Sequence, residues 1–249
     1  VDASELVASA YFNSWDSYNH IYPWFNTAQQ YPPDMDIPQY NFYYLADNKH
    51  NPDKNVVWTD VYIDPAGHGW MASAIAPVYN GDFLEGVVGL DITVSNIIQS
   101  IQNLSVPWGG YALLVSNTGT IMAMPPKGEE DFALKELTEY DYQTAITSEV
   151  FKPDTFNLFE RYDTKALSKL MSESEQGIHN TMLNNANKLI AWATIAGTQW
   201  QLLLVVDENT MYAEPRGLEN KYRNIGYLLI FGLVFFYTVF LIFIWRSSI

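Results

Sequence analysis

Short runs of aromatic and β-branched residues, separated by turn-forming residues, dominate the first hundred positions of the chain. Such runs are typical of strands, and we expect strands at residues 41–46, 56–59, 70–79 and 84–93. The Asn80-Gly81 pair between the last two runs predicts a hairpin, because both residue types tolerate the backbone of a tight turn. Apolar residues at helical spacing follow, which predicts a short helix that Ser95 caps and that ends near Leu104.

A similar pattern starts again near residue 105. Strand-like runs at 111–116 and 120–124 flank a turn at Asn117-Thr118-Gly119, and a helix is expected from Thr164 to about Glu175, ending at Gly177. Two further strand-like runs follow at 188–195 and 200–206. Each half therefore predicts a small antiparallel sheet with flanking helices, which is an α+β fold. We expect two modules, at residues 1–104 and 105–212.

The stretch from Ile225 to Trp245 is apolar and contains no charged residue. A helix of that length spans about 30 Å, which matches the hydrocarbon core of a bilayer. We therefore expect a juxtamembrane segment from residue 213 and one transmembrane helix at 225–245. The chain begins without Met and ends soon after this helix, so we expect a fragment of a longer protein. The flanking charges alone leave both membrane orientations open.

Composition and motifs exclude several classes of function. With 28 acidic against 13 basic residues, the net charge of −15 argues against a nucleic-acid partner. The chain has no cysteine, and so no disulfide and no thiolate site. The motifs of serine hydrolases, zinc proteases and nucleotide-binding loops are absent, and the four histidines lack metal-ligand spacing. We expect no catalytic residue, metal or cofactor in this region.

Charge placement in the first half indicates the class of ligand. Residues 1–110 contain twelve acidic residues and eighteen aromatic ones, but only two basic residues, Lys49 and Lys54, and no Arg. Aromatic faces and carboxylates attract ammonium groups. A ligand carboxylate or phosphate would instead favour an Arg fork. A pocket in this half is therefore expected to prefer an amine over an anion, although most of the rings are expected to form core.

Asp91 differs from the acidic residues found in turns. It lies inside an apolar run at residues 86–92, where a carboxylate must be hydrogen-bonded or paired with a ligand to offset its desolvation. Residues such as Asp47, Asp53 and Asp82 are turn-formers by comparison. Asp91 is thus the leading candidate for a functional carboxylate.

Several motifs in the chain resemble those of the double Cache sensor domain. They are Trp58-Thr-Asp-Val-Tyr62-Ile-Asp64, Gly69-Trp70-x-x-Ser73, Pro77-Val-Tyr79 and Gly86-Val-Val-Gly89-x-Asp91-Ile92, with looser likeness at 111–115, 119–123 and 192–200. The resemblance covers about residues 10–212. It implies two stacked PAS-like modules in a bacterial inner-membrane receptor, with residues 1–224 in the periplasm or exterior. It also implies a homodimer and a cytoplasmic output domain in cis, of the chemoreceptor, histidine kinase or diguanylate cyclase type.

The resemblance also suggests ligand-binding positions. Amino-acid-binding members use an Arg-x-Trp-Tyr motif and an Asp on a late strand, and Trp24, Phe25 and Asp91 are similar to three of these positions. Tyr22 stands where the carboxylate-binding Arg would be, which favours an amine over an α-amino acid. The expected ligand-binding residues are Tyr22, Trp24, Phe25, Tyr62, Asp64, Trp70 and Asp91.

Two other classes of function are considered beside the sensor. One is a membrane-anchored scaffold or channel-associated accessory subunit that has a Cache fold but does not signal. The other, less favoured, is an anchored hydrolase that uses carboxylates such as Asp60 and Asp64. For the sensor, a small amine-bearing or amino-acid-like metabolite is the expected ligand.

Overall fold

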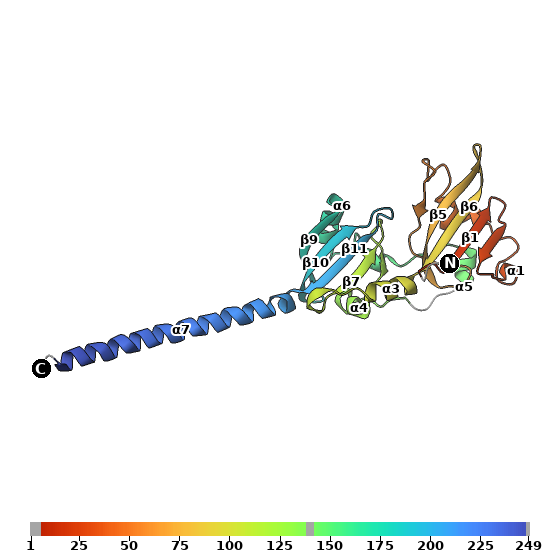
Figure 1. Ribbon diagram of the computed structural model, residues 1–249. Helices are drawn as coiled ribbons and strands as arrows, with labels where there is room; N and C mark the ends of the chain where they lie inside the picture. Colours follow the sequence, from red (N-terminus) through yellow and green to blue (C-terminus); the bar gives the residue numbers. More distant parts are fainter. Residues whose placement is uncertain (1–5, 138–141, 248–249) are drawn as a thin grey trace. The chain divides into compact units, whose positions relative to one another are not determined.

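The computed structural model describes residues 6–137 and 142–247 of the chain. Residues up to Val206 form one compact unit, and residues from Asp207 onward form a second. The first unit contains two antiparallel sheets with flanking helices (Figure 1), which confirms the predicted α+β class.

The first sheet has the order β2-β1-β6-β5-β3, and β4 also pairs with β5. Its strands are β1 (Ser9–Ser14), β2 (Asn19–Tyr22), β3 (Val57–Trp58), β4 (Tyr62–Ile63), β5 (Trp70–Asn80) and β6 (Phe83–Thr93). The predicted hairpin at Asn80-Gly81 joins β5 to β6, and Gly81 adopts the left-handed conformation, with φ of +61°. Along β6, Val87, Gly89 and Asp91 are buried while Val88 and Leu90 are exposed, as strand alternation requires.

Short helical segments cover the buried face of the first sheet. They are α1 (Thr27–Gln30), a 3₁₀ turn at Ile37–Gln39, and α2 (Asn41–Tyr44). The strand predicted at 41–46 is therefore wrong. Ile37, Tyr40, Phe42 and Tyr43 are buried and join the core beneath the sheet. Aromatic residues can be buried equally well in a short helix or in a strand, so composition alone did not distinguish the two.

Helix α3 (Val94–Gln102) leaves β6 and begins one residue earlier than the predicted cap. The capping side chain is Thr93, whose hydroxyl accepts the Asn96 N–H at 3.2 Å, and not Ser95. The buried face of α3 presents Val94, Ile97 and Ile101 to a core cluster that also contains residues of both sheets. The two sheets are therefore joined by shared apolar packing.

The second sheet has the order β8-β7-β11-β10-β9. Its strands are β7 (Tyr111–Val115), β8 (Ile121–Ala123), β9 (Gln176–Leu183), β10 (Ala186–Thr194) and β11 (Gln201–Asp207). The same half of the chain also contains α4 (Pro126–Phe132), α5 (Tyr142–Thr147), α6 (Lys165–Glu173) and 3₁₀ turns at Pro107–Gly109 and Asp154–Phe156. Strand β9 was not predicted. Gly177, where the predicted helix was expected to end, belongs to β9 and lies opposite Trp192 of β10. The Trp192 ring occupies the space that a side chain at 177 would need, 2.4 Å from the Cβ position, so only glycine fits there.

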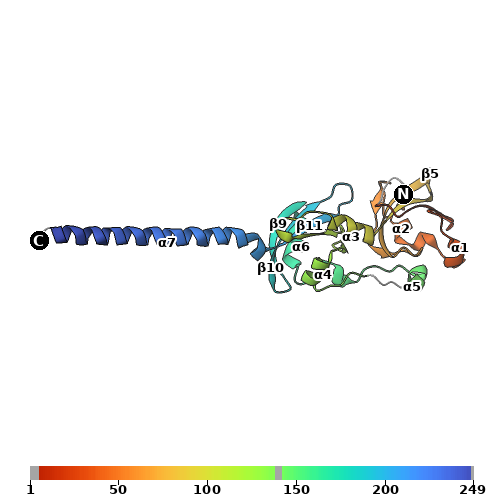
Figure 2. The ribbon, with the colours of Figure 1, turned by 60° about the horizontal axis from the view of Figure 1, so that its bottom comes forward.

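A segment of the second half returns to the first sheet. In both views α5 lies with the elements of that sheet, apart from α4 and α6 (Figure 1, Figure 2). The Ile63 N–H donates to the Val150 carbonyl at 2.9 Å, and the Tyr40 hydroxyl donates to the Ile146 carbonyl at 2.5 Å. The predicted boundary at 104/105 falls between α3 and β7, but these contacts cross it.

The second unit is helix α7 (Glu208–Ser247). Its segment Lys221–Arg246 has a mean hydropathy of 2.7, and by length and composition it can cross a membrane. The predicted span at 225–245 lies within this segment.

Candidate functional site

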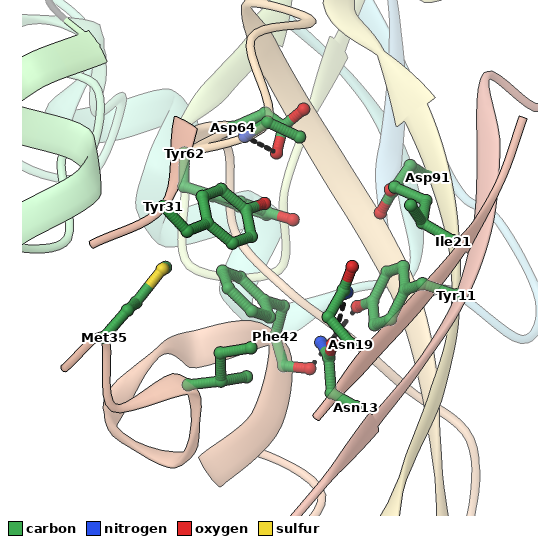
Figure 3. A pocket seen from close by; sticks show the side chains of 12 residues that line it. Tyr11, Asn13, Asn19, Ile21, Tyr31, Met35, Phe42, Tyr62, Asp64 and Asp91 are labelled. Atoms are coloured by element: carbon green, nitrogen blue, oxygen red, sulfur yellow. Dashed lines mark hydrogen bonds between the residues drawn. The ribbon is translucent and has the colours of Figure 1, made fainter. Parts of the chain in front are cut away.

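A cavity lies against the buried face of the first sheet, among β1, β2, β6 and the segment that carries α1 and α2 (Figure 3). About 340 Å³ of space free of protein atoms, part of it open to solvent, lies between these elements. Its polar lining consists of Tyr11, Asn13, Asn19, Tyr31, Tyr62, Asp64 and Asp91. Its apolar lining consists of Ile21, Met35, Ile37, Phe42 and Ala66.

Strand register places two hydroxyls beside the Asp91 carboxylate. Asp91 lies on the central strand β6, directly opposite Ser9 of β1 and Ser73 of β5. The Ser9 hydroxyl donates to Asp91 Oδ2, and the Ser73 hydroxyl donates to Oδ1 at 2.6 Å. Asp91 is only 3% exposed, so these donors replace part of the hydration that the carboxylate loses on burial.

The hydrogen bonds around Ser73 have a fixed direction. Ser73 has one hydroxyl proton, and it is donated to Asp91, so the contact of 2.7 Å between Tyr62 Oη and Ser73 Oγ has Tyr62 as its donor. The Ser73 N–H in turn donates to the Thr59 hydroxyl oxygen at 2.9 Å. Tyr62, Ser73 and Asp91 thus form one relay that orients the carboxylate.

The second carboxylate, Asp64, is held in a turn that follows β4. Asp64 Oδ1 accepts the Ala66 N–H at 2.9 Å, and Oδ2 lies 2.6 Å from His68 Nδ1. Gly67 and Gly69 have φ of 100° and 85°, which is backbone that other residues rarely adopt and that this tight turn requires. The hydrogen bond that His68 donates to Asp64 raises the pKa of His68, so the imidazolium form is favoured beside this carboxylate.

The cavity is electrostatically acidic. Burial, followed by the nearby Asp64 charge, raises the pKa of Asp91 to about 7, although the Ser73 and Ser9 donors and His68 partly oppose the shift. Burial also raises the pKa of the lining tyrosines, which remain neutral. None of the described residues that line the cavity is Lys or Arg. Two carboxylates therefore face this space with no lining cation against them.

The ring of Tyr11 forms part of the cavity wall because β6 has a glycine opposite it. Tyr11 pairs with Gly89 across the two strands, and a Cβ at position 89 would lie 2.0 Å from a ring atom of Tyr11. The Tyr11 hydroxyl also donates to the Phe42 carbonyl at 3.4 Å. This close approach keeps the Tyr11 side chain flat against the sheet.

Three of the seven predicted ligand-binding residues come together in the cavity: Tyr62, Asp64 and Asp91. Tyr22 and Trp24 are 50% and 80% exposed and do not line it. On the edge strand β2 the side chain of Ile21 faces the cavity, so alternation turns that of Tyr22 to the other side.

The remaining two predicted residues lie beside the cavity or away from it. Phe25 contacts Tyr31, with ring centroids 5.7 Å apart, and lines a neighbouring groove together with Gln30 and Ala66. Trp70 is buried in the core cluster that joins the two sheets. For Tyr22, Trp24, Phe25 and Trp70, a role in ligand binding stays a prediction.

The sequence did not indicate Tyr11, Asn13, Asn19 and Tyr31, which line the cavity, or Ser9, which donates to Asp91. Strand β1 does carry a usable signal, because Ser9, Tyr11 and Asn13 alternate with Ala10 and Phe12. No sequence signal places β1 next to β6, so the neighbours of Asp91 emerge only from the sheet order. Among the described residues, no cluster of three or more His, Asp or Glu side chains is arranged to hold a metal ion.

Comparison with known families assigns the first half of the chain. Residues 7–99 match the family model described as methyl-accepting chemotaxis protein-like, first PDC sensor domain. The match covers the whole first sheet and the cavity. The chain therefore contains a sensor domain of the Cache, or PDC, type.

Curated relatives fall into two groups. The methyl-accepting chemotaxis protein PctB of Pseudomonas aeruginosa is 25% identical over 158 residues, which is 62% of this chain and 20% of PctB. The voltage-dependent calcium channel subunit alpha-2/delta-2 of Mus musculus is 22% identical over 180 residues, which is 68% of this chain and 15% of the subunit. The chain thus spans a fifth or less of the length of these relatives.

Solved structures share the fold of the chain. The ligand-binding domain of Pseudomonas aeruginosa PAO1 PctB in complex with L-Arg aligns with a TM-score of 0.57 and 20% identity, covering 83% of this chain and 74% of that one. The ligand-binding domain of Pseudomonas fluorescens chemoreceptor CtaA with L-alanine gives 0.56 and 22%, covering 83% and 75%. The alignments confirm the Cache fold over most of the chain.

Proposed function

We propose that this chain is the extracytoplasmic ligand-sensing region of a bacterial transmembrane receptor, and that its first module binds a small amine-bearing metabolite. The observation that carries the proposal is the cavity in which the buried Asp91 and Asp64 face a space lined by no described Lys or Arg. Asp64 already contacts His68, and a cationic ligand would supply a partner for the Asp91 carboxylate.

The chemistry of the cavity suits an ammonium group. A primary ammonium donates up to three hydrogen bonds, and the carboxylate oxygens of Asp91 have lone pairs beyond those used by Ser9 and Ser73. The rings of Tyr11 and Tyr31 add aromatic surface, which attracts cations. The ammonium is therefore proposed to contact Asp91, with Asp64 contributing negative charge nearby.

The ligands of the similar structures support the amine end of this assignment. PctB is described in complex with L-Arg and with L-Gln, and CtaA with L-alanine. These ligands share an α-ammonium group, which a carboxylate accommodates. They also carry a carboxylate, which an Arg or Lys side chain would normally bind. None of the described residues that line the cavity of this chain is Arg or Lys. An amine without an adjacent carboxylate is therefore the favoured ligand.

The receptor assignment rests on the sensor domain together with helix α7. Chemotaxis proteins of Pseudomonas aeruginosa and Bacillus subtilis match the sensor region, and α7 is able to span a membrane. We propose that residues 1–224 lie outside the cytoplasm of a bacterial inner membrane, with an output domain in cis beyond α7, and that the receptor is a homodimer. The relatives favour a chemoreceptor output over a kinase or cyclase.

A second candidate is an accessory subunit that does not signal. The match to a calcium channel subunit over 68% of the chain favours it, because that relative combines the same sensor-like region with a different role. The two candidates differ in ligand binding, since an accessory subunit does not require a competent cavity.

Calorimetric titration of the detergent-solubilised chain with small amines tests the proposal. We expect saturable binding that weakens on the order of 10- to 100-fold in Asp91→Asn, because a charge-assisted hydrogen bond is lost. Asp82→Asn, the same change at an exposed turn of the same module, serves as the control and retains full affinity. No binding to any amine would move the assignment toward the accessory subunit.

A further inference from the structure

Two asparagines form a pair on the cavity side of β1 and β2. Asn13 and Asn19 lie opposite each other in the strand register, and Asn19 Nδ2 donates to Asn13 Oδ1 at 2.7 Å. This hydrogen bond holds the Asn19 carboxamide with its oxygen, and not its amino group, toward the cavity. In Figure 3 that oxygen is directed into the space that Tyr31, Asp64 and Asp91 surround.

The Asn19 oxygen is an acceptor without a donor. Asn19 Oδ1 is shielded from solvent, and it has no hydrogen-bond partner among residues 6–137 and 142–247. A buried acceptor that makes no hydrogen bond costs free energy, and a ligand with a matching donor relieves that cost on binding. The side chain is thus prepared for a donor that the protein itself does not provide.

Asp64, Asp91 and Asn19 each present an acceptor oxygen to the cavity. Asp64 and Asp91 offer carboxylate oxygens, and Asn19 offers an amide oxygen. Asp91 already accepts from Ser9 and Ser73, whereas Asn19 Oδ1 accepts from no described residue. A ligand with donors at both ends would satisfy both positions, and an ammonium, which donates three hydrogen bonds and accepts none, matches acceptor oxygens better than a hydroxyl.

We infer that Asn19 is a specificity-determining residue that accepts a hydrogen bond from a second donor group of the ligand, so that the site selects diamines over monoamines. This inference rests on the proposed function, since it takes the first ammonium to be at Asp91. It adds a requirement that Asp91 alone does not impose, namely a second N–H donor at the β1–β2 side of the cavity.

The test is titration of the detergent-solubilised full chain with α,ω-diamines and with n-alkylamines of matched chain length. For the wild type we expect the best diamine to bind at least about tenfold more tightly than its matched monoamine. Asn19→Leu, which is close in shape but has no acceptor, should bring that ratio near one. Asn187→Leu makes the same change at an exposed position of β10 and should retain the wild-type ratio.

A second variant addresses the orientation of the amide. Asn19→Asp can only accept hydrogen bonds, so it should keep or increase the preference for diamines. A diamine preference that persists in Asn19→Leu, or that is lost in Asn19→Asp with the fold intact by thermal unfolding, would overturn the inference. Equal binding of both series by the wild type would overturn it while leaving the proposed amine function standing. Failure of both series to bind would overturn the two together.

Discussion

Ser73 of β5 lies directly opposite Asp91 of β6, and its hydroxyl donates a hydrogen bond of 2.6 Å to Asp91 Oδ1. The same hydroxyl oxygen accepts from Tyr62, so a single serine connects the cavity wall to the carboxylate that we propose binds the ligand. Both residues are fully buried or nearly so, at 0% and 3% exposure. The relay is therefore buried, and it orients the carboxylate that is proposed to bind the ligand.

Replacement of Ser73 by Ala tests this relay. The change leaves Asp91 with one donor fewer and Tyr62 without its acceptor, so unfolding free energy should fall by about 1–3 kcal/mol. Chemical denaturation followed by tryptophan fluorescence measures it. Ser100→Ala, at an exposed hydroxyl of α3, is the control and should change stability by less than about 0.5 kcal/mol. Equal effects of the two variants would contradict the relay.

The affinity for an amine should depend on pH. Burial and Asp64 raise the pKa of Asp91 to about 7, and an ammonium requires the ionised carboxylate. Affinity should therefore rise as pH increases toward 7 and level off above about 8, with roughly a tenfold gain per pH unit below the pKa. Titration across this range, with the amine fully protonated throughout, measures the slope. A flat profile would show that Asp91 is already ionised in the ligand-free protein.

The stability of the ligand-free protein should show the opposite trend. A carboxyl whose folded-state pKa is raised binds more protons in the folded than in the unfolded chain between about pH 4 and 7. Its contribution to stability is present below that window and is lost as the pH rises through it. The pKa of His68 is also raised in the folded protein, so the stability that its protonated form contributes is likewise lost as the pH rises through that pKa. In Asp91→Asn, stability should vary less with pH over this range.

Removal of one partner from a buried ion pair in the second half of the chain should lower the free energy of unfolding strongly. Lys152, with a fully buried side chain, contacts Glu136 and donates to the Met122 carbonyl at 3.0 Å. Lys152→Met leaves Glu136 unpaired and should destabilise the protein by about 3–5 kcal/mol. The double change Lys152→Met with Glu136→Gln should recover most of that loss.

An exposed ion pair provides the contrast in the same denaturation measurement. Lys169 Nζ and Glu173 Oε1 on α6 are 3.9 Å apart, and both side chains are largely exposed. Lys169→Met should therefore lower the free energy of unfolding by less than about 1 kcal/mol. A similar cost for Lys152→Met would contradict the buried arrangement.

Gly89 should tolerate no side chain while Tyr11 keeps its position. A methyl group at 89 would meet the Tyr11 ring 2.0 Å away and force it into the cavity. Gly89→Ala should therefore lower stability by about 1–3 kcal/mol and weaken amine binding. In a double-mutant cycle with Tyr11→Leu, the two stability losses should be less than additive, because the smaller side chain relieves the clash. Strict additivity would indicate that the ring and position 89 do not meet.

The sequence predicted the parts of the fold that local patterns determine. Strands β5 and β6 and their hairpin follow from alternation and from Asn80-Gly81, and Asp91 stood out as a polar residue within an apolar strand. The segment 41–46 was misread because aromatic composition fits a strand and a short buried helix equally well. Strand β9 is largely polar with alternate residues exposed, so it carried little signal.

Non-local geometry explains what the sequence did not reveal about the site. Ser9 lies opposite Asp91, and Asn13 opposite Asn19, only because β1 lies between β2 and β6, which no local pattern indicates. Tyr22 was predicted from a motif alignment, but strand alternation turns it away from the cavity that its neighbour Ile21 lines. The carboxylates were identifiable from their types and positions, whereas the residues around them depend on sheet order.

The most direct test of amine binding at Asp91 is a thermal-shift panel of amines, polyamines, amino acids and organic acids, run on the wild-type chain and on Asp91→Ala. A ligand at 100-fold its dissociation constant stabilises by about 2.7 kcal/mol, which corresponds to roughly 5–10 °C for a domain of this size. We expect such a shift with amines, and its loss in Asp91→Ala. A shift produced only by carboxylic acids, and unchanged in Asp91→Ala, would contradict it.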